Sequence, residues 1–279
     1  MAIDSAVAAY LEPSASAAER TQCVGCIVAL LTQRSQTALS LVQALQACLI
    51  SDDAEQRLRG TSLLNEVIRA GGPQGALAPG DLQHLATFMT ARLSDWSCTE
   101  PAAQACTTLL QLGRPPPSHS TQPSASSQAC LAESDCLGLV RSVVDELAGH
   151  VQELTQRERQ ASLQLMLTAT QVCGAAAARS GLDLAEACVA AIDGEKDPRC
   201  LLLAFSLVKA QAPEVVEVLS CYFPLTFTPP KNDPHRISRA QLASALEHAL
   251  AASPFLATWV VPLVLEKLSS TYRYHGGSS

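Results

Sequence analysis

Two cysteines near the N-terminus have the spacing of a metal or redox site. Cys23 and Cys26 are separated by two residues, in a chain of 279 residues that contains 11 cysteines. A metal ion or a cluster would need two further soft ligands at compatible spacing, and the sequence holds no second Cys-x-x-Cys. On a helix the pair shares a face with Ile27 and Leu30, which favours two small buried hydrophobes. We therefore predict no metal and no cofactor, with a redox or metal protein using Cys23 and Cys26 as the alternative.

A second cluster of polar residues lies near residue 195. It reads Asp193, Gly194, Glu195, Lys196, Asp197 and Pro198. The segment lacks the alternating oxygen ligands of a calcium loop. Asp197 precedes a proline, and an acceptor side chain directly before a proline is typical of a helix start. We interpret the segment as a helix-capping turn whose charges face water.

The other motifs of catalysis are missing from the sequence. There is no Gly-x-Gly-x-x-Gly, no P-loop, no Gly-x-Ser-x-Gly and no His-Glu-x-x-His. The six histidines show no paired spacing with cysteines or carboxylates. We predict no catalytic residue and no enzymatic activity. His235 stands apart because it belongs to an irregular proline-rich segment, described below.

Charge and hydropathy exclude two further classes of function. The net charge is −7, from 19 Lys and Arg against 26 Asp and Glu, whereas a protein that grips nucleic acid by counterion release normally shows the opposite balance. The longest apolar runs, at residues 23–31 and 255–265, fall short of the roughly 18 residues that a membrane span needs. We expect no direct contact with nucleic acid, no membrane insertion, and reduced thiols inside the cell.

Helical periodicity dominates the elements that position these residues. One buried helix face is formed by Leu41, Val42, Leu45, Cys48 and Leu49, and similar stripes recur to residue 268 without sustained alternation of period two. The fold class is therefore all-α. At about 40–47 residues per helix pair the chain holds about six antiparallel pairs, which favours a HEAT/armadillo-type α-solenoid. A closed helix bundle is the competing architecture.

Caps and prolines divide the chain into segments. Asp52 with Glu55 and Ser238 with Gln241 have the spacing of capping boxes, and Gly71-Gly72-Pro73 ends a helix near residue 70. We predict helical repeats over residues 1–112 and 129–270, a mobile Pro/Ser-rich linker over 113–128, and a tail over 271–279, where the last clear helix ends.

The segment at residues 223–237 is also rich in proline but differs from the linker because it keeps apolar side chains. We expect it to be extended, with those side chains anchored on the helices. Ordered long loops are either functional or fastened for stability, so two interpretations stay open: a loop anchor or a contact with a partner. The candidate residues are Tyr222, Phe223, Pro224, Phe227, Pro229, Pro230, Asn232, Asp233, Pro234 and His235.

Two stretches resemble a known family. They read DGEKDPRCLLLAFSLV from residue 193 and SCYFPLTFTPPKNDPHRIS from residue 220, the latter followed by PLVLEKLSS at 262–270. Together they resemble the N-terminal domain of the HEAT-repeat targeting adaptors of cytosolic iron–sulfur protein assembly, also called the methyl-methanesulfonate-sensitivity DNA repair and transcription family. Residues 59–67 and 92–95 resemble the family more weakly, so the firm resemblance covers about the last third of the chain.

The resemblance implies a non-enzymatic scaffold found in nucleus and cytoplasm. Its implied partners are proteins: the iron–sulfur assembly subunits, and apo iron–sulfur helicases and polymerases of DNA repair, replication and transcription. The family's members are several times longer, and their far C-terminal repeats dock the other assembly subunits. A generic HEAT or armadillo scaffold for trafficking or transcription is the alternative. The family has glycine where this chain has Arg236, so a turn that needs φ > 0 there must be strained or rebuilt.

Overall fold

The computed structural model describes residues 2–113, 131–211, 219–230 and 234–275. Those residues form α-helices, short 3₁₀ turns and connections, with no strand among them. The all-α prediction is confirmed. The predicted linker at 113–128 lies outside the described residues, apart from Gly113.

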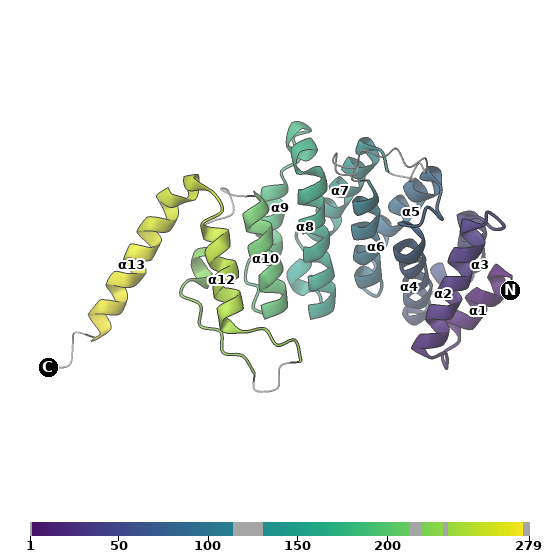
Figure 1. Ribbon diagram of the computed structural model, residues 1–279, viewed down its shortest axis with the longest axis horizontal. Coiled ribbons are helices and arrows are strands. Elements are labelled where there is room, and N and C mark those ends of the chain that lie inside the picture. Colours follow the sequence, from purple (N-terminus) through teal and green to yellow (C-terminus); the bar gives the residue numbers. More distant parts are fainter. Residues whose placement is uncertain (1, 114–130, 212–218, 231–233, 276–279) are drawn as a thin grey trace, which may run out of the picture.

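Within the described residues, five antiparallel helix pairs follow one another (Figure 1). They are α1 (Ile3–Leu11) with α2 (Ala17–Thr32), α3 (Ala38–Leu49) with α4 (Ala54–Gly71), α5 (Pro79–Ala91) with α6 (Thr99–Leu112), α7 (Glu133–Leu147) with α8 (Gln156–Arg179), and α9 (Leu184–Ile192) with α10 (Pro198–Gln211). Two more helices, α12 (Arg239–Leu250) and α13 (Ala257–His275), complete the described chain.

The pairs stack into two layers. The even layer consists of α2, α4, α6, α8, α10 and α12, each packed on the next, and the odd layer of α1, α3, α5, α7 and α9 covers one side of it. Figure 1 shows α6, α8 and α10 in front of α7 and α9, with the two chain ends at opposite ends of an arch. Substantial contacts join only helices of the same or neighbouring pairs in the described residues. The chain is therefore an open α-solenoid rather than a closed bundle.

Side-chain caps set where the helices begin. Ser238 accepts a hydrogen bond from the Gln241 backbone N–H at 3.1 Å, at the predicted position. At α4 the prediction was one residue early, because Asp53 rather than Asp52 is the cap and accepts from the Glu55 N–H at 2.9 Å. The backbone carbonyl of Asp52 instead accepts from the Arg57 guanidinium at 3.0 Å. That contact holds Asp52 outside the helix.

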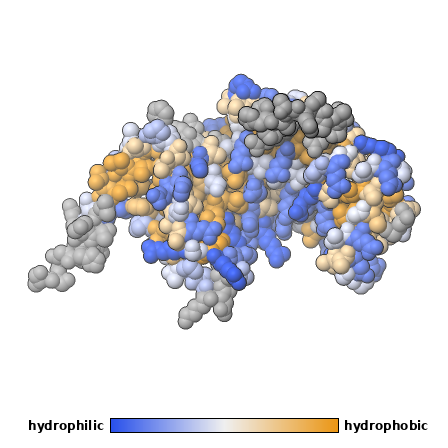
Figure 2. Space-filling view, viewed as in Figure 1, coloured by the Kyte–Doolittle hydropathy of each residue, from blue (hydrophilic) through white to orange (hydrophobic). Residues whose placement is uncertain are grey.

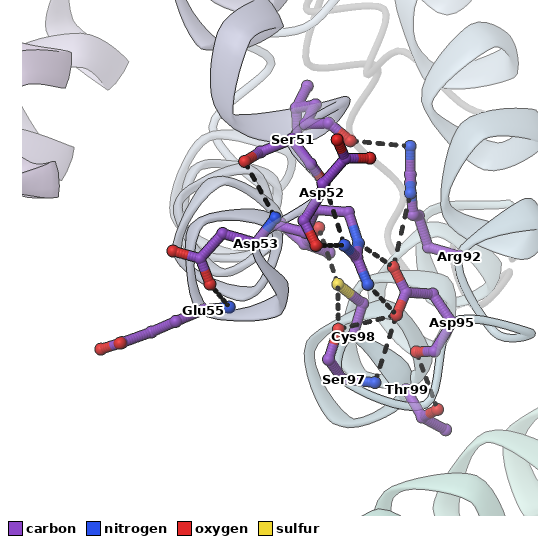
Figure 3. A network of polar contacts seen from close by, with 12 residues as sticks. Ser51, Asp52, Asp53, Glu55, Arg92, Asp95, Ser97, Cys98 and Thr99 are labelled. Carbon is purple, nitrogen blue, oxygen red and sulfur yellow. Dashed lines mark hydrogen bonds and ion pairs between the residues drawn. The ribbon is translucent and has the colours of Figure 1, made fainter.

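Two ion pairs with little solvent exposure join neighbouring repeats through arginines in the first turn of an even-layer helix. On α4, Arg57 Nε lies 2.7 Å from Asp95 Oδ2, in the turn before α6. On α8, Arg159 Nε lies 2.9 Å from Glu195 Oε2, in the turn before α10. Figure 3 shows Asp95 at the centre of its polar network, with Arg92 and Ser97 also directed at its carboxylate. Each pair therefore links one even-layer helix to the start of the next.

The last helix is longer than predicted. We ended it at residue 270, whereas α13 continues to His275. Residues 271–275 contain neither proline nor glycine, so no strong helix breaker ends the helix before the glycines at 276 and 277. The packing of α13 is chiefly with the 3₁₀ turn Pro254–Leu256 that introduces it. Within the described chain, no helix is both long and apolar enough to span a bilayer.

A candidate protein-interaction site

The predicted turn and the predicted proline-rich loop meet at the start of α10. Arg199 binds Asp197 with two hydrogen bonds, Nε to Oδ1 at 3.0 Å and Nη2 to Oδ2 at 2.8 Å. Its third nitrogen, Nη1, lies 2.8 Å from Nε2 of His235. One guanidinium thus connects the turn at 193–198 to the far end of the loop at 222–237. Two segments that the sequence singled out separately form one cluster.

The turn is only in part the solvated charged face that we expected, because Asp193 and Lys196 are exposed but Glu195 is buried. Glu195 is only 2% exposed, because its carboxylate accepts from Arg159 and from the backbone N–H groups of Lys196 and Asp197, both at 2.8 Å. Asp197 does act as a cap, since it accepts from the Arg199 backbone N–H at 2.9 Å. The Arg199 hydrogen bond also holds the pKa of Asp197 below its ordinary value. Glu195 therefore anchors the turn from inside.

The apolar residues of the loop face the helices. The Tyr222 ring meets Phe205 of α10 edge to face, with centroids 5.8 Å apart, and its hydroxyl donates to the Ile192 carbonyl at 3.0 Å. Phe223 and Phe227 are half-buried against the core, and a cis peptide bond joins Phe223 to Pro224. Burial raises the pKa of Tyr222 well above its usual range, so the hydroxyl stays protonated as a donor.

The tip of the loop is turned to solvent. Its exposed side chains include Pro229, Pro230, Pro234 and His235. Asn232 and Asp233 lie outside the described residues. Arg236 has φ +52°, so the turn keeps the left-handed conformation and carries the strain rather than being rebuilt.

A polar trough that was not predicted from the sequence crosses the even layer. It is a hollow of about 640 Å³ that runs obliquely from the end of α4, over α6 and the first third of α8, to the start of α10 and His235. The lining residues are Arg69, Glu100, Gln104, Thr107, Thr108, Gln111, Gln156, Arg157, Gln160, Ala161, Gln164, Arg199, Leu203 and His235. Figure 2 shows hydrophilic side chains gathered over α6 and α8.

The trough had a visible signal in the sequence. Gln156, Gln160 and Gln164 recur every four residues, which places three amides on one face of α8. Polar stripes of this kind are usual on solvated helices, so the spacing alone did not distinguish a site. The stripe becomes a trough only because α4, α6, α8 and α10 lie side by side.

The cysteines behave as small apolar residues. Cys23 is buried on α2 and Cys26 is half-buried. Burial raises the pKa of the Cys23 thiol, which disfavours the thiolate that metal binding or redox chemistry needs. None of the ten described cysteines is in a disulfide, and the described chain holds no cluster of three metal-binding side chains.

Two stacked layers of helices, with an open polar trough across one of them, define the structural class of this protein. It is a helical-repeat protein, a class whose repeats present extended binding surfaces. The chain belongs to the MMS19 family, because residues 42–275 match the family described as "MMS19_N: Dos2-interacting transcription regulator of RNA-Pol-II". The match is wider than the last third of the chain to which we assigned the firm resemblance.

Curated relatives agree with this assignment. The chain is 28% identical over 276 residues to the "MMS19 nucleotide excision repair protein homolog" of Arabidopsis thaliana, covering 94% of this chain and 23% of that protein. It is 31% identical over 244 residues to the proteins of the same name from Mus musculus and Homo sapiens, covering 84% of this chain and 22% of each relative. The chain thus spans less than a quarter of the length of these relatives.

Proposed function

We propose that this chain acts as a non-enzymatic adaptor module that targets cytosolic iron–sulfur assembly to apoproteins of DNA repair, replication and transcription. The observation that carries the proposal is the family match over residues 42–275. The names of the relatives refer to nucleotide excision repair, and the family description refers to transcription. These are two of the processes in which we place the proposed client proteins.

The proposed mechanism is proximity. An adaptor holds a client and an assembly factor close together, and the gain comes from effective concentration rather than from bonds made or broken. The cluster is cargo in this mechanism and is not held by the chain. An open solenoid supports such a role, since it presents the even layer as one continuous surface. We further propose that the adaptor works in both nucleus and cytoplasm, with iron–sulfur assembly subunits and apo helicases and polymerases as partners.

The alternative is a generic HEAT scaffold for trafficking or transcription. The two proposals differ in the partners they require, because the alternative predicts transport receptors, cargo or polymerase subunits without iron–sulfur sites. The family description favours transcription within this alternative. Only the identity of the bound proteins separates the two.

The test is a tagged pull-down of this chain from its own cells, with quantitative mass spectrometry, in iron-replete and iron-depleted cultures. We expect iron–sulfur helicases and polymerases to be enriched over a tag-only control, and more strongly after iron depletion, when these clients accumulate without clusters. Transport receptors or cargo in their place would favour the generic scaffold. Recovery of neither class would contradict client binding by this module.

A further inference from the structure

The trough has the chemistry of a site for polypeptide backbone. Its lining includes the amides of Gln104, Gln111, Gln156, Gln160 and Gln164 and the hydroxyls of Thr107 and Thr108. Each amide carries both a donor and an acceptor. An extended peptide presents the same two groups along its length and leaves them unpaired. A helical peptide would fit less well. Its backbone donors and acceptors are already paired with each other, and its apolar face would find few apolar contacts in the trough.

The amides of the trough are only partly used within the chain. Gln156 donates to Gln160 Oε1 at 3.1 Å, and Asn65 donates to Gln104 Oε1 at 2.9 Å. Asn65 is 4% exposed and lines an adjoining hollow that shares Gln104 with the trough, yet its Oδ1 has no hydrogen-bond partner. A buried acceptor without a partner is costly. This unpaired acceptor lies in the hollow that adjoins the trough at Gln104.

Charge in the trough selects an acidic occupant. Arg69 and Arg157 are exposed in the lining, and neither forms an ion pair with another described residue. The lining holds one carboxylate, Glu100, which accepts from Gln104 Nε2 at 3.2 Å. This cationic excess lies in a chain of net charge −7. An arginine guanidinium binds a carboxylate through two parallel hydrogen bonds, and the Asp or Glu side chains of a peptide supply such carboxylates.

The length of the trough sets the length of the occupant. It crosses from α4 to α10, three steps between neighbouring even-layer helices, or about 25–30 Å at the usual spacing of packed helices. An extended chain covers that distance in about eight or nine residues. We propose that the trough binds an extended acidic segment of a partner protein, with the amides of α6 and α8 pairing its backbone and Arg69 and Arg157 binding its carboxylates.

This inference rests on the proposed function, since it names the kind of segment through which a client docks. The test uses the full chain and a phage library of random ten-residue peptides, followed by fluorescence polarisation with the best enriched peptide. We expect enriched peptides to carry at least two Asp or Glu residues. Arg157→Glu should weaken the peptide's binding about tenfold or more, as loss of a charged two-point contact does.

Matched variants separate the trough from general effects of charge. Arg141→Glu makes the same charge change at an exposed position of α7 in the odd layer, and should leave the peptide's affinity within twofold. Gln104→Ala with Gln160→Ala should weaken binding, whereas Gln43→Ala with Gln46→Ala on α3 should not. Circular dichroism of each variant checks that the fold persists.

Three outcomes would overturn the inference: no enrichment of peptides, enrichment of basic or apolar peptides, or binding that the trough variants leave unchanged. A labelled oligo-dT strand tests the competing class. Binding of that strand, lost in Arg157→Glu, would assign the trough to single-stranded nucleic acid instead. A pull-down that recovers iron–sulfur clients, together with an inactive trough, would keep the proposed function and reject only this site.

Discussion

At the scale of single residues, Arg57 and Arg159 occupy equivalent places in the second and fourth helix pairs. Each donates its Nε to a carboxylate that lies 36 to 38 residues later in the chain. Each also donates Nη1 to a backbone carbonyl just before its own helix, Ser51 for Arg57 and Leu154 for Arg159. Each arginine therefore holds the residues that precede its own helix and also the turn that precedes the next helix of the layer.

Glu195→Ala is expected to destabilise the chain strongly. The change leaves the Arg159 guanidinium and two backbone N–H groups without their acceptor in a buried turn. Breaking a buried pair costs about 3–5 kcal/mol of unfolding free energy. Glu133→Ala is the control, because the Glu133–Arg179 pair is 68% exposed on both sides and should contribute less than about 1 kcal/mol. Urea unfolding compares the two variants, and equal losses would contradict this account.

Asp95 should make the stability of the chain depend on acid pH. The Arg57 hydrogen bond holds the pKa of Asp95 far below its ordinary value, so the folded state binds fewer protons than the unfolded state. The stabilisation is complete above the unfolded pKa of about 4 and is lost as the pH falls below it. Asp95→Asn should be less stable at neutral pH and should lose less stability between about pH 5 and pH 3.

The control for this prediction is Asp145→Asn, at an exposed position of α7. Urea midpoints at several pH values give the measurement. If the wild type and Asp95→Asn lose stability in parallel through the acid range, Asp95 is not the group responsible.

At the scale of elements, the helices were predictable and several contacts between them were not. The stripe of Leu41, Leu45 and Leu49 predicted α3 because a buried face repeats every three to four residues. The burial of Glu195 was not predictable, because its partner Arg159 lies 36 residues earlier and no local pattern joins them. The trough could not be predicted for the same reason, because Gln104, Gln160 and Arg199 belong to three different helices.

The proline-rich loop combines predictable and unpredictable parts. Its apolar residues predicted a segment packed on the helices, and the structure places Tyr222 on Phe205 and Ile237 in the core. The contact between His235 and Arg199 has no local signal, because it depends on how the loop returns to α10. The sequence alone left two backbone conformations possible for the turn at Arg236, and the structure has the strained one.

Arg236→Gly is expected to stabilise the loop. Arg236 has φ +52° and an exposed side chain. A left-handed conformation costs a non-glycine residue about 1–2 kcal/mol, and the extra entropy of glycine in the unfolded chain offsets about 0.5–1 kcal/mol of the gain. The midpoint of thermal unfolding, or the protection of loop amides against hydrogen exchange, should rise modestly.

Arg34→Gly provides the contrast. Arg34 also has positive φ, at +56°, but its guanidinium donates to the carbonyls of Gly75 and Ala76 at 3.3 and 3.4 Å. Removing these contacts cancels the relief of strain, so no gain is expected at this position. Equal stabilisation by both substitutions would show that backbone strain alone decides, and that the Arg34 contacts contribute little.

At the scale of the whole molecule, the described chain is a row of helix pairs in which substantial contacts are confined to adjacent pairs. The apolar core is continuous from Ile3 to Leu250, yet each pair packs only on the pairs beside it. The far end differs from the rest: Trp259, Val261 and Leu265 of α13 are more than half exposed, and Figure 2 shows a hydrophobic surface there. Stability in such a stack is a sum of repeat terms and interfaces between repeats.

A cavity near one end should therefore unfold that end alone. Ile27 on α2 is fully buried, and Ile27→Ala should cost about 2–5 kcal/mol. Native-state hydrogen exchange should then show lost protection in α1 to α4, while amides of α8 and α10 keep theirs, because no substantial contact connects these helices to α2. Phe205→Ala on α10 is the mirror experiment and should expose α10, α12 and the loop but spare α1 to α4. A uniform loss of protection in either variant would mean that the stack unfolds as one unit and that its repeats are not independent.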